Sequence, residues 1–136
     1  MLVSNLLAIH QKKYIGKLSA FCGAVSAGYA CGAAITYMLG GNFTQIANTI
    51  INTLANTSGI ICDGAKPSCA AKISSALDAA LLAHTMSMHD DVFHADEGIV
   101  KDDLEKTIRA VGYIGREGMK STDIEVLNIM IDKVCP

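Results

Sequence analysis

The sequence predicts an all-α protein: a compact helical domain of about five to six helices around a central helix rich in small residues. Apolar residues recur at the spacing of one helix face in several segments, and no segment shows the sustained alternation of a half-buried strand. With 136 residues, the chain is long enough for one domain with a real core and too short for two well-packed ones. We therefore expect residues 1–136 to form a single helical domain.

The composition is apolar for such a domain. Hydrophobic residues make up 51% and charged residues 18%, and no Asp, Glu, Lys, Arg or His lies between Lys17 and Asp63. This pattern indicates either a membrane segment or apolar surface that meets something missing from the chain. The net charge of −2, without a basic cluster, argues against nucleic-acid binding.

Residues 18–39 are rich in Ala, Gly and Ser and are long enough to span a bilayer. Their mean hydropathy is modest for a membrane helix, and small residues suit a close contact between helices. We therefore expect a buried central helix and no membrane span. Gly40 and Gly41 end this helix, and Asn42 can cap the next one.

Three further helices are expected after this one. In residues 43–56 the apolar positions follow a spacing of four, which is a helical pattern. Pro67 is well placed at the start of a helix over residues 68–88, and acidic residues favour the start of another over residues 101–113. The residues expected to share one face of helix 68–88 are Ile73, Leu77, Ala80, Leu81 and His84.

A last amphipathic helix is expected near the end of the chain. Gly112, Gly115 and Gly118 would break the preceding helix, and Thr122 and Glu125 have the spacing of a capping box. The residues expected to be buried on this last helix are Ile124, Leu127, Ile131 and Val134.

The five cysteines are the main chemical signal. An odd number makes a closed disulfide framework a poor explanation, and no secretory signal precedes them, so we expect a cytoplasmic protein whose cysteines bind metal or serve redox chemistry. Cys62 and Cys69 lie in one loop that contains Gly and Pro, and Cys69 is at a helix N-terminus, where the thiolate is favoured. On these residues alone, metal ligation and buried structural cysteines both remain open.

Three stretches carry a resemblance to a known family. They are the small-residue helix around Cys22 that leads to Gly40-Gly41, residues 59–73, and the segments 97–100, 107–109, 117–119 and 122–123. In this order along the chain, they resemble the C-terminal part of the iron–sulfur L-cysteine desulfidases. That group is akin to the α chain of bacterial iron–sulfur L-serine dehydratases. The resemblance covers nearly the whole chain.

This resemblance implies a [4Fe–4S] cluster held by three cysteines, which match Cys22, Cys62 and Cys69. One iron would then be free to act as a Lewis acid on the thiol or hydroxyl group of L-cysteine or L-serine, and the products would be pyruvate and ammonia. Pyridoxal phosphate would not be needed. The loop lacks the Cys-Asp-Pro sequence typical of serine dehydratases, which favours the desulfidase branch.

Family members are much longer than this chain. The part expected to supply the proton-abstracting group is absent, so the catalytic residues are unknown and the chain is expected to be inactive alone. The expected partners are a small amino-acid substrate, the missing N-terminal half or a separate chain, and further copies in a homo-oligomer. The alternative is a non-catalytic helical module that serves interaction or oligomerisation.

Several other residues have two possible roles. Lys66 could pair with a substrate carboxylate, and Asp63 could accept a substrate amine or orient its loop. Cys31 is expected to be a packed core thiol, because it lies half a turn away from the face of Cys22. Cys135 could be a fourth cluster ligand, but a penultimate position favours an exposed and inert thiol. His84 is expected in the core or at an interface, and His89 and His94 in a loop.

Overall fold

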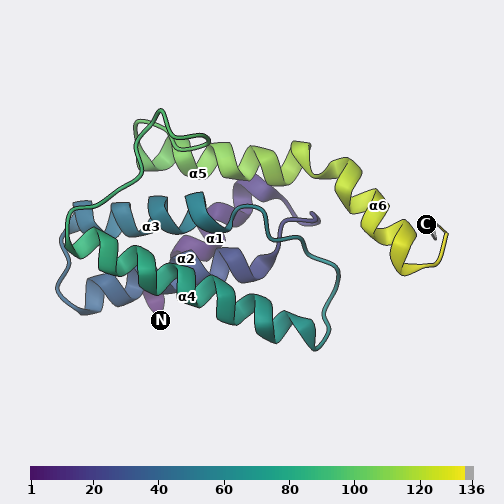
Figure 1. The fold of residues 1–136 in the computed structure, drawn as a ribbon, viewed down its shortest axis with the longest axis horizontal. Coiled ribbons are helices and arrows are strands. Elements are labelled where there is room, and N and C mark those ends of the chain that lie inside the picture. Colours follow the sequence, from purple (N-terminus) through teal and green to yellow (C-terminus); the bar gives the residue numbers. More distant parts are fainter. Residues whose placement is uncertain (134–136) are drawn as a thin grey trace.

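The computed structural model confirms the all-α prediction (Figure 1). The structure describes residues 1–133, and this part contains six α-helices, one π-helical turn and no strand. The elements are α1 (Leu2–Ile15), α2 (Gly23–Met38), α3 (Phe43–Thr57), α4 (Ser68–Met88), α5 (Leu104–Tyr113), η1 (Ile114–Gly118) and α6 (Lys120–Met130). None of the helices in this part combines the length and apolar character needed to cross a membrane.

Helix α2 lies at the centre and packs against α1, α3 and α4, as the small-residue pattern predicts. Glycines allow this approach. A Cβ atom added at Gly28 would lie 2.7 Å from the backbone oxygen of Ala76, and one at Gly32 would lie 2.9 Å from the Cβ of Ala80. The backbones of α2 and α4 therefore pack with almost no side-chain volume between them.

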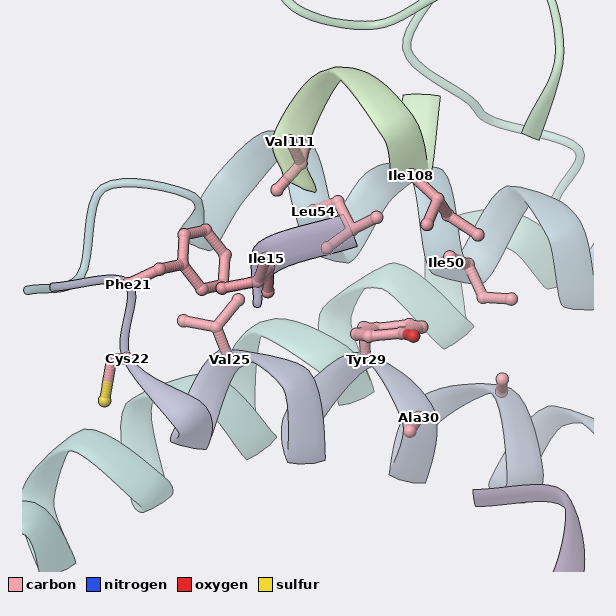
Figure 2. Packing of buried hydrophobic residues seen from close by; sticks show 11 residues of the cluster. Ile15, Phe21, Cys22, Val25, Tyr29, Ala30, Ile50, Leu54, Ile108 and Val111 are labelled. Atoms are coloured by element: carbon pink, nitrogen blue, oxygen red, sulfur yellow. The ribbon is translucent and has the colours of Figure 1, made fainter. Parts of the chain in front are cut away.

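The hydrophobic core lies between α2 and the helices α1, α3 and α5 (Figure 2). Tyr29 is fully buried, and its hydroxyl donates a hydrogen bond of 2.5 Å to the backbone oxygen of Leu7. Burial raises the pKa of the Tyr29 phenol. The other buried members of this cluster are Ile15, Phe21, Cys22, Val25, Ala30, Ala33, Ile50, Leu54, Ile108 and Val111.

A buried polar network joins α2, α3 and α4. The hydroxyl of Thr36 lies 2.9 Å from that of Thr49 and 2.9 Å from Nδ1 of His84, and Thr49 donates to Ser87 over 3.0 Å. His84 is half-buried, which confirms its predicted place in the core or at an interface. Because each group has a partner, these polar side chains can be buried at little cost.

The start of α3 agrees with the sequence in detail. Gly40 adopts a left-handed φ of 85°, and Asn42 forms a capping box with Gln45. Helix α4 likewise begins after Pro67.

Helix α4 does not bury the face on which the sequence places its larger apolar residues. Its buried residues are Ala76, Ala79, Ala80, Ala83 and Ser87. Ile73, Leu77 and Leu81 are instead 56%, 38% and 41% exposed. The reason is the close approach to the glycines of α2, which admits only small side chains and leaves the larger apolar residues outside.

The predicted break after α5 is also wrong. Helix α5 continues into the π-helical turn η1. Gly112 and Gly115 do not end the helix and instead allow close contacts with other segments. A Cβ at Gly112 would clash with Tyr14, and one at Gly115 would lie 3.2 Å from Phe21 Cβ. Helix α6 starts at Lys120 with Met119 as N-cap, so the capping box predicted at Thr122 is not formed.

Helix α6 leaves the bundle and has no buried residue (Figure 1). The predicted burial of Ile124, Leu127 and Ile131 is wrong within this chain, since they are 57%, 52% and 57% exposed. The only element that α6 contacts in residues 1–133 is η1. Val134 and Cys135 lie outside the described residues.

Candidate metal centre

Cys22, Cys62 and Cys69 line one cavity of about 340 Å³, although they come from three separate segments of the chain. The other residues that line the cavity are Gly23, Ala24, Ala27, Gly64, Ala65 and Ile73. All of these except Ile73 are small. The structure thus brings together the three cysteines predicted as ligands; their role as ligands remains a prediction.

Cys22 is the N-cap of α2 and is buried. The predicted helix that starts near Leu18 and contains Cys22 is wrong at its start, because residues 16–22 are not helical and α2 begins at Gly23. Phe21 points into the hydrophobic core, whereas the sulfur of Cys22 points away from it (Figure 2). The core therefore anchors the segment that presents this thiol.

An antiparallel bridge joins the segments of Cys22 and Cys62. The bridge pairs Phe21 with Ile61. The backbone N–H of Cys22 donates to Ile60 O over 3.1 Å, and that of Cys62 donates to Ala20 O over 2.6 Å. These two bonds hold the two segments together with Cys22 opposite Ile60 and Cys62 opposite Ala20, so both cysteines lie next to the bridge.

Cys69 lies in the first turn of α4 and is half-buried, like Cys62. Its Sγ donates to the backbone oxygen of Gly64 over 3.2 Å. Gly64 has a left-handed φ of 88°, so a glycine is favoured where the loop turns back. With Cys22 and Cys69 at two helix N-termini, the helix dipoles favour negative charge at this cavity.

Asp63 is engaged in two ion pairs, one with Lys66 at 2.7 Å and one with Lys72. The hydrogen bond from Lys66, followed by that from Lys72, lowers the pKa of the Asp63 carboxyl to about 2. This arrangement orients the loop, which is one of the two roles predicted for Asp63. Its role towards a substrate amine remains a prediction.

Lys66 faces a second cavity of about 320 Å³, which lies between the cysteine loop and α6. Asp63 and Lys72 also line it, together with apolar residues of α6 that include Met130. The side chain of Lys66 is 44% exposed, so it can reach a small ligand. Its pairing with a substrate carboxylate remains a prediction.

Lys72 has no role in the sequence analysis, yet its Nζ donates to Ile61 O over 2.8 Å and to Asp63 Oδ1. The hydrogen bond to Asp63 and, to a smaller extent, the nearby thiols of Cys22 and Cys69 raise the pKa of Lys72. The sequence feature that could have pointed to Lys72 is its position in α4, one helical turn after Cys69.

Cys31 is exposed, so the prediction of a packed core thiol is wrong. It lies on the exposed face of α2, one turn after Ala27, but it does not itself line the cavity of the other three cysteines. The helical periodicity predicted that Cys31 lies on a different face of the helix from Cys22. It could not show that this second face is exposed to solvent.

The donor type at this cavity is the one that iron–sulfur clusters use, since such clusters are held by cysteine thiolates. In residues 1–133 no three His, Cys, Asp or Glu side chains lie close enough to hold one metal ion. A cluster at these three cysteines remains a prediction.

Another cavity, of about 590 Å³, lies between α1 and residues 101–116. Three of its four cations, Lys106, Arg109 and Arg116, are each paired with a neighbouring carboxylate, which largely neutralises their charge. The cavity of the cysteines gathers three thiols and is the better candidate for metal chemistry.

The chain was compared with known proteins. Residues 1–128 match the family described as serine dehydratase alpha chain. The chain is 60% identical to a UPF0597 protein of Treponema denticola, with 96% of the chain and 30% of that protein covered. It is 53% identical to a UPF0597 protein of Finegoldia magna, with 98% of the chain and 32% of that protein covered.

The chain therefore spans about a third of the length of the curated relatives that it matches. No solved structure matches it. Because the family match extends over nearly all of its residues, this chain belongs to the serine dehydratase alpha chain family.

Proposed function

We propose that this chain is the cluster-carrying part of a lyase that removes H₂S from L-cysteine, or water from L-serine. The observation that carries the proposal is the convergence of Cys22, Cys62 and Cys69 on one cavity, in a chain of the serine dehydratase alpha chain family. This family supports a lyase-associated role in amino-acid catabolism.

When bound, a [4Fe–4S] cluster with three protein ligands supplies a Lewis-acid site for the leaving thiol or hydroxyl group. The chain itself would contribute three cysteine ligands, two of which, Cys22 and Cys69, lie at helix N-termini, where negative charge is favoured. Small walls leave space beside the thiols for a small amino acid, and Lys66 at the adjacent cavity is suited to its carboxylate. Asp63 holds this part of the loop in place through its ion pairs.

The reaction needs a base that removes the α-proton, and we assign that base to a part corresponding to the two thirds of the relatives' length that this chain does not span. Loss of the α-proton and of hydrosulfide from the β-carbon of L-cysteine, which together make H₂S, gives aminoacrylate, and water converts this to pyruvate and ammonia. The chain alone is thus proposed to be inactive, to act with the remaining part or a separate chain, and to form homo-oligomers.

The test is anaerobic reconstitution of the purified chain with iron and sulfide, followed by iron analysis and a visible spectrum. We expect a [4Fe–4S] spectrum, which Cys22→Ser, Cys62→Ser and Cys69→Ser should each abolish. Cys31→Ser is the matched control, because Cys31 is exposed and does not line the cavity. A full cluster in the Cys22 variant would refute the ligand set, and no uptake by the folded, reduced chain would refute a cluster site in this chain alone.

The second candidate function is a non-catalytic helical module that binds a partner or further copies. The observation that favours it is the exposed apolar surface, which includes Tyr37, Met38, Leu39 and Phe43 around the connection of α2 and α3. In that case the folded and reduced chain would take up no iron and would form a stable oligomer.

A further inference from the structure

Lys72 connects helix α4 to the two residues that flank Cys62. Its Nζ donates to the backbone oxygen of Ile61, on one side of this cysteine, and to the carboxylate of Asp63 on the other side. The side chain of Lys72 is only 23% exposed, and it lies one turn after Cys69 on the same helix. One ammonium group therefore links the segment of Cys62 to the helix that carries Cys69.

The other links within the site do not replace this one. The bridge between Phe21 and Ile61 joins Cys62 to the segment of Cys22, and it does not involve α4. The ion pair between Asp63 and Lys66 lies within the loop, before the helix begins.

The remaining side-chain link between the loop and α4 is the bond from Cys69 Sγ to Gly64 O. It is a single bond to one backbone oxygen. Lys72 instead makes two bonds, to Ile61 O and to Asp63, on both sides of Cys62.

We infer that Lys72 is a positioning residue, which fixes Cys62 relative to Cys69 through its bonds to Ile61 O and Asp63 and thereby preorganises the thiols of the cavity. This inference rests on the proposed function only in taking these cysteines as one ligand set. Lys72 does not act as a ligand itself, and it needs no cluster to hold the thiols in place.

The test uses phenylarsine oxide, an arsenic(III) probe that binds two neighbouring thiols, so that thiol geometry is measured without iron. The parent chain carries Cys31→Ser and Cys135→Ser, which leaves Cys22, Cys62 and Cys69 as its only thiols. Lys72→Met removes the two hydrogen bonds and keeps an unbranched apolar stem. We expect the dissociation constant to rise about tenfold or more, as for other residues that orient metal ligands.

Three variants complete the design. Lys72→Arg keeps the charge and the donors, and we expect binding close to that of the parent. Asp63→Asn weakens the same link from its other end and should add little when combined with Lys72→Met. Lys106→Met is the matched control, since Lys106 pairs with Asp102 far along the chain from the cysteines.

Equal affinity of Lys72→Met and the parent would overturn the inference, as would an equal loss in Lys72→Met and Lys106→Met. Far-UV circular dichroism and thermal unfolding confirm that each variant is folded, and Asp63→Asn provides the test if Lys72→Met is not. Failure of cluster reconstitution together with the expected arsenical result would count against the proposed function and leave the positioning role of Lys72 intact.

Discussion

At the scale of single residues, glycines set the distance between α2 and α4. Gly28 faces backbone atoms of Ala76, which cannot move away as the end of a flexible side chain can. Alanine has a better helix propensity than glycine by about 1 kcal/mol, but overpacking a tight contact typically costs about 1–3 kcal/mol. The clash therefore decides the sign of a substitution at this position.

We predict that Gly28→Ala lowers the free energy of unfolding by about 1–2 kcal/mol, because its Cβ would lie 2.7 Å from Ala76 O. The measurement is chemical denaturation followed by circular dichroism. Gly23→Ala in the same helix is the control, since a Cβ there meets no atom within 4 Å, and its effect should be near zero. A Gly28→Ala variant as stable as the control would show that α2 and α4 can separate without cost.

The site could be predicted from the sequence only in part, for reasons visible in single residues. The loop residues Cys62 and Cys69 have a recognisable spacing next to a helix N-terminus. Cys22 could be added only through the family resemblance, because its place beside Cys62 depends on a backbone bridge between distant segments. Lys72 was missed, since a lysine on a helix normally indicates a solvated face and its acceptors lie in an irregular loop.

At the scale of elements, Glu105 joins α5 to α1. Its carboxylate accepts hydrogen bonds from Tyr14 over 2.5 Å and from His10 over 2.8 Å, and it pairs with Arg109 of its own helix. The hydrogen bond from Tyr14, followed by the contacts with His10 and Arg109, lowers the pKa of Glu105 from its ordinary value. A carboxyl group with a lowered pKa adds stability above its unfolded pKa, and this stability is lost as the pH falls.

We predict that Glu105→Gln lowers the free energy of unfolding at neutral pH by about 1 kcal/mol or less, because the side chain is 40% exposed and solvent screens the pairs. The difference from the unsubstituted chain should shrink as the pH falls below 4.5, the ordinary pKa of Glu105. Denaturant titrations at several pH values measure it. Glu125→Gln on the exposed face of α6 is the control, and a constant difference at all pH values would contradict the assignment to the charge of Glu105.

Helix α6 shows where periodicity misleads. The spacing of Ile124, Leu127 and Ile131 correctly predicts a helix, but a stripe of apolar residues does not say what covers it. In the described part of this chain nothing does. The chain break predicted at Gly112 is wrong for a related reason. Glycine is favoured at a chain break and also where two segments come close, as Gly112 does to Tyr14. By contrast, Asn42 and Gln45 act within one turn, and their capping box could be predicted from neighbouring residues alone.

We predict that Leu127→Gln in α6 changes the free energy of unfolding by less than about 0.5 kcal/mol, as is usual for exposed positions. Leu54→Ala in α3 is the comparison, because Leu54 is fully buried and its truncation should cost about 2–5 kcal/mol. Both values come from denaturant titrations at a low protein concentration. A large loss for Leu127→Gln would mean that α6 packs on the bundle in solution.

At the scale of the whole molecule, several apolar faces lie open at once. The outer face of α4 exposes Ile73 and Leu82, α1 exposes Leu6 and Ile9, and α6 exposes its whole apolar stripe. The chain spans about a third of the length of its relatives. Exposed apolar residues on several faces indicate an interface, and we expect a partner to cover them, such as the part of the relatives that this chain does not span.

Without that occupant the purified chain should cover its apolar surface with further copies of itself. We predict self-association that grows with concentration in size-exclusion chromatography with light scattering. The combined substitution of Ile124, Leu127 and Ile131 by Gln should weaken it with little change in unfolding, because these side chains are exposed in the monomer. The same substitution of Lys120, Asp123 and Glu125, on the same helix, is the control for helix content. A monomer at all concentrations would contradict this account, since burial of apolar surface is then not required for the chain to remain in solution.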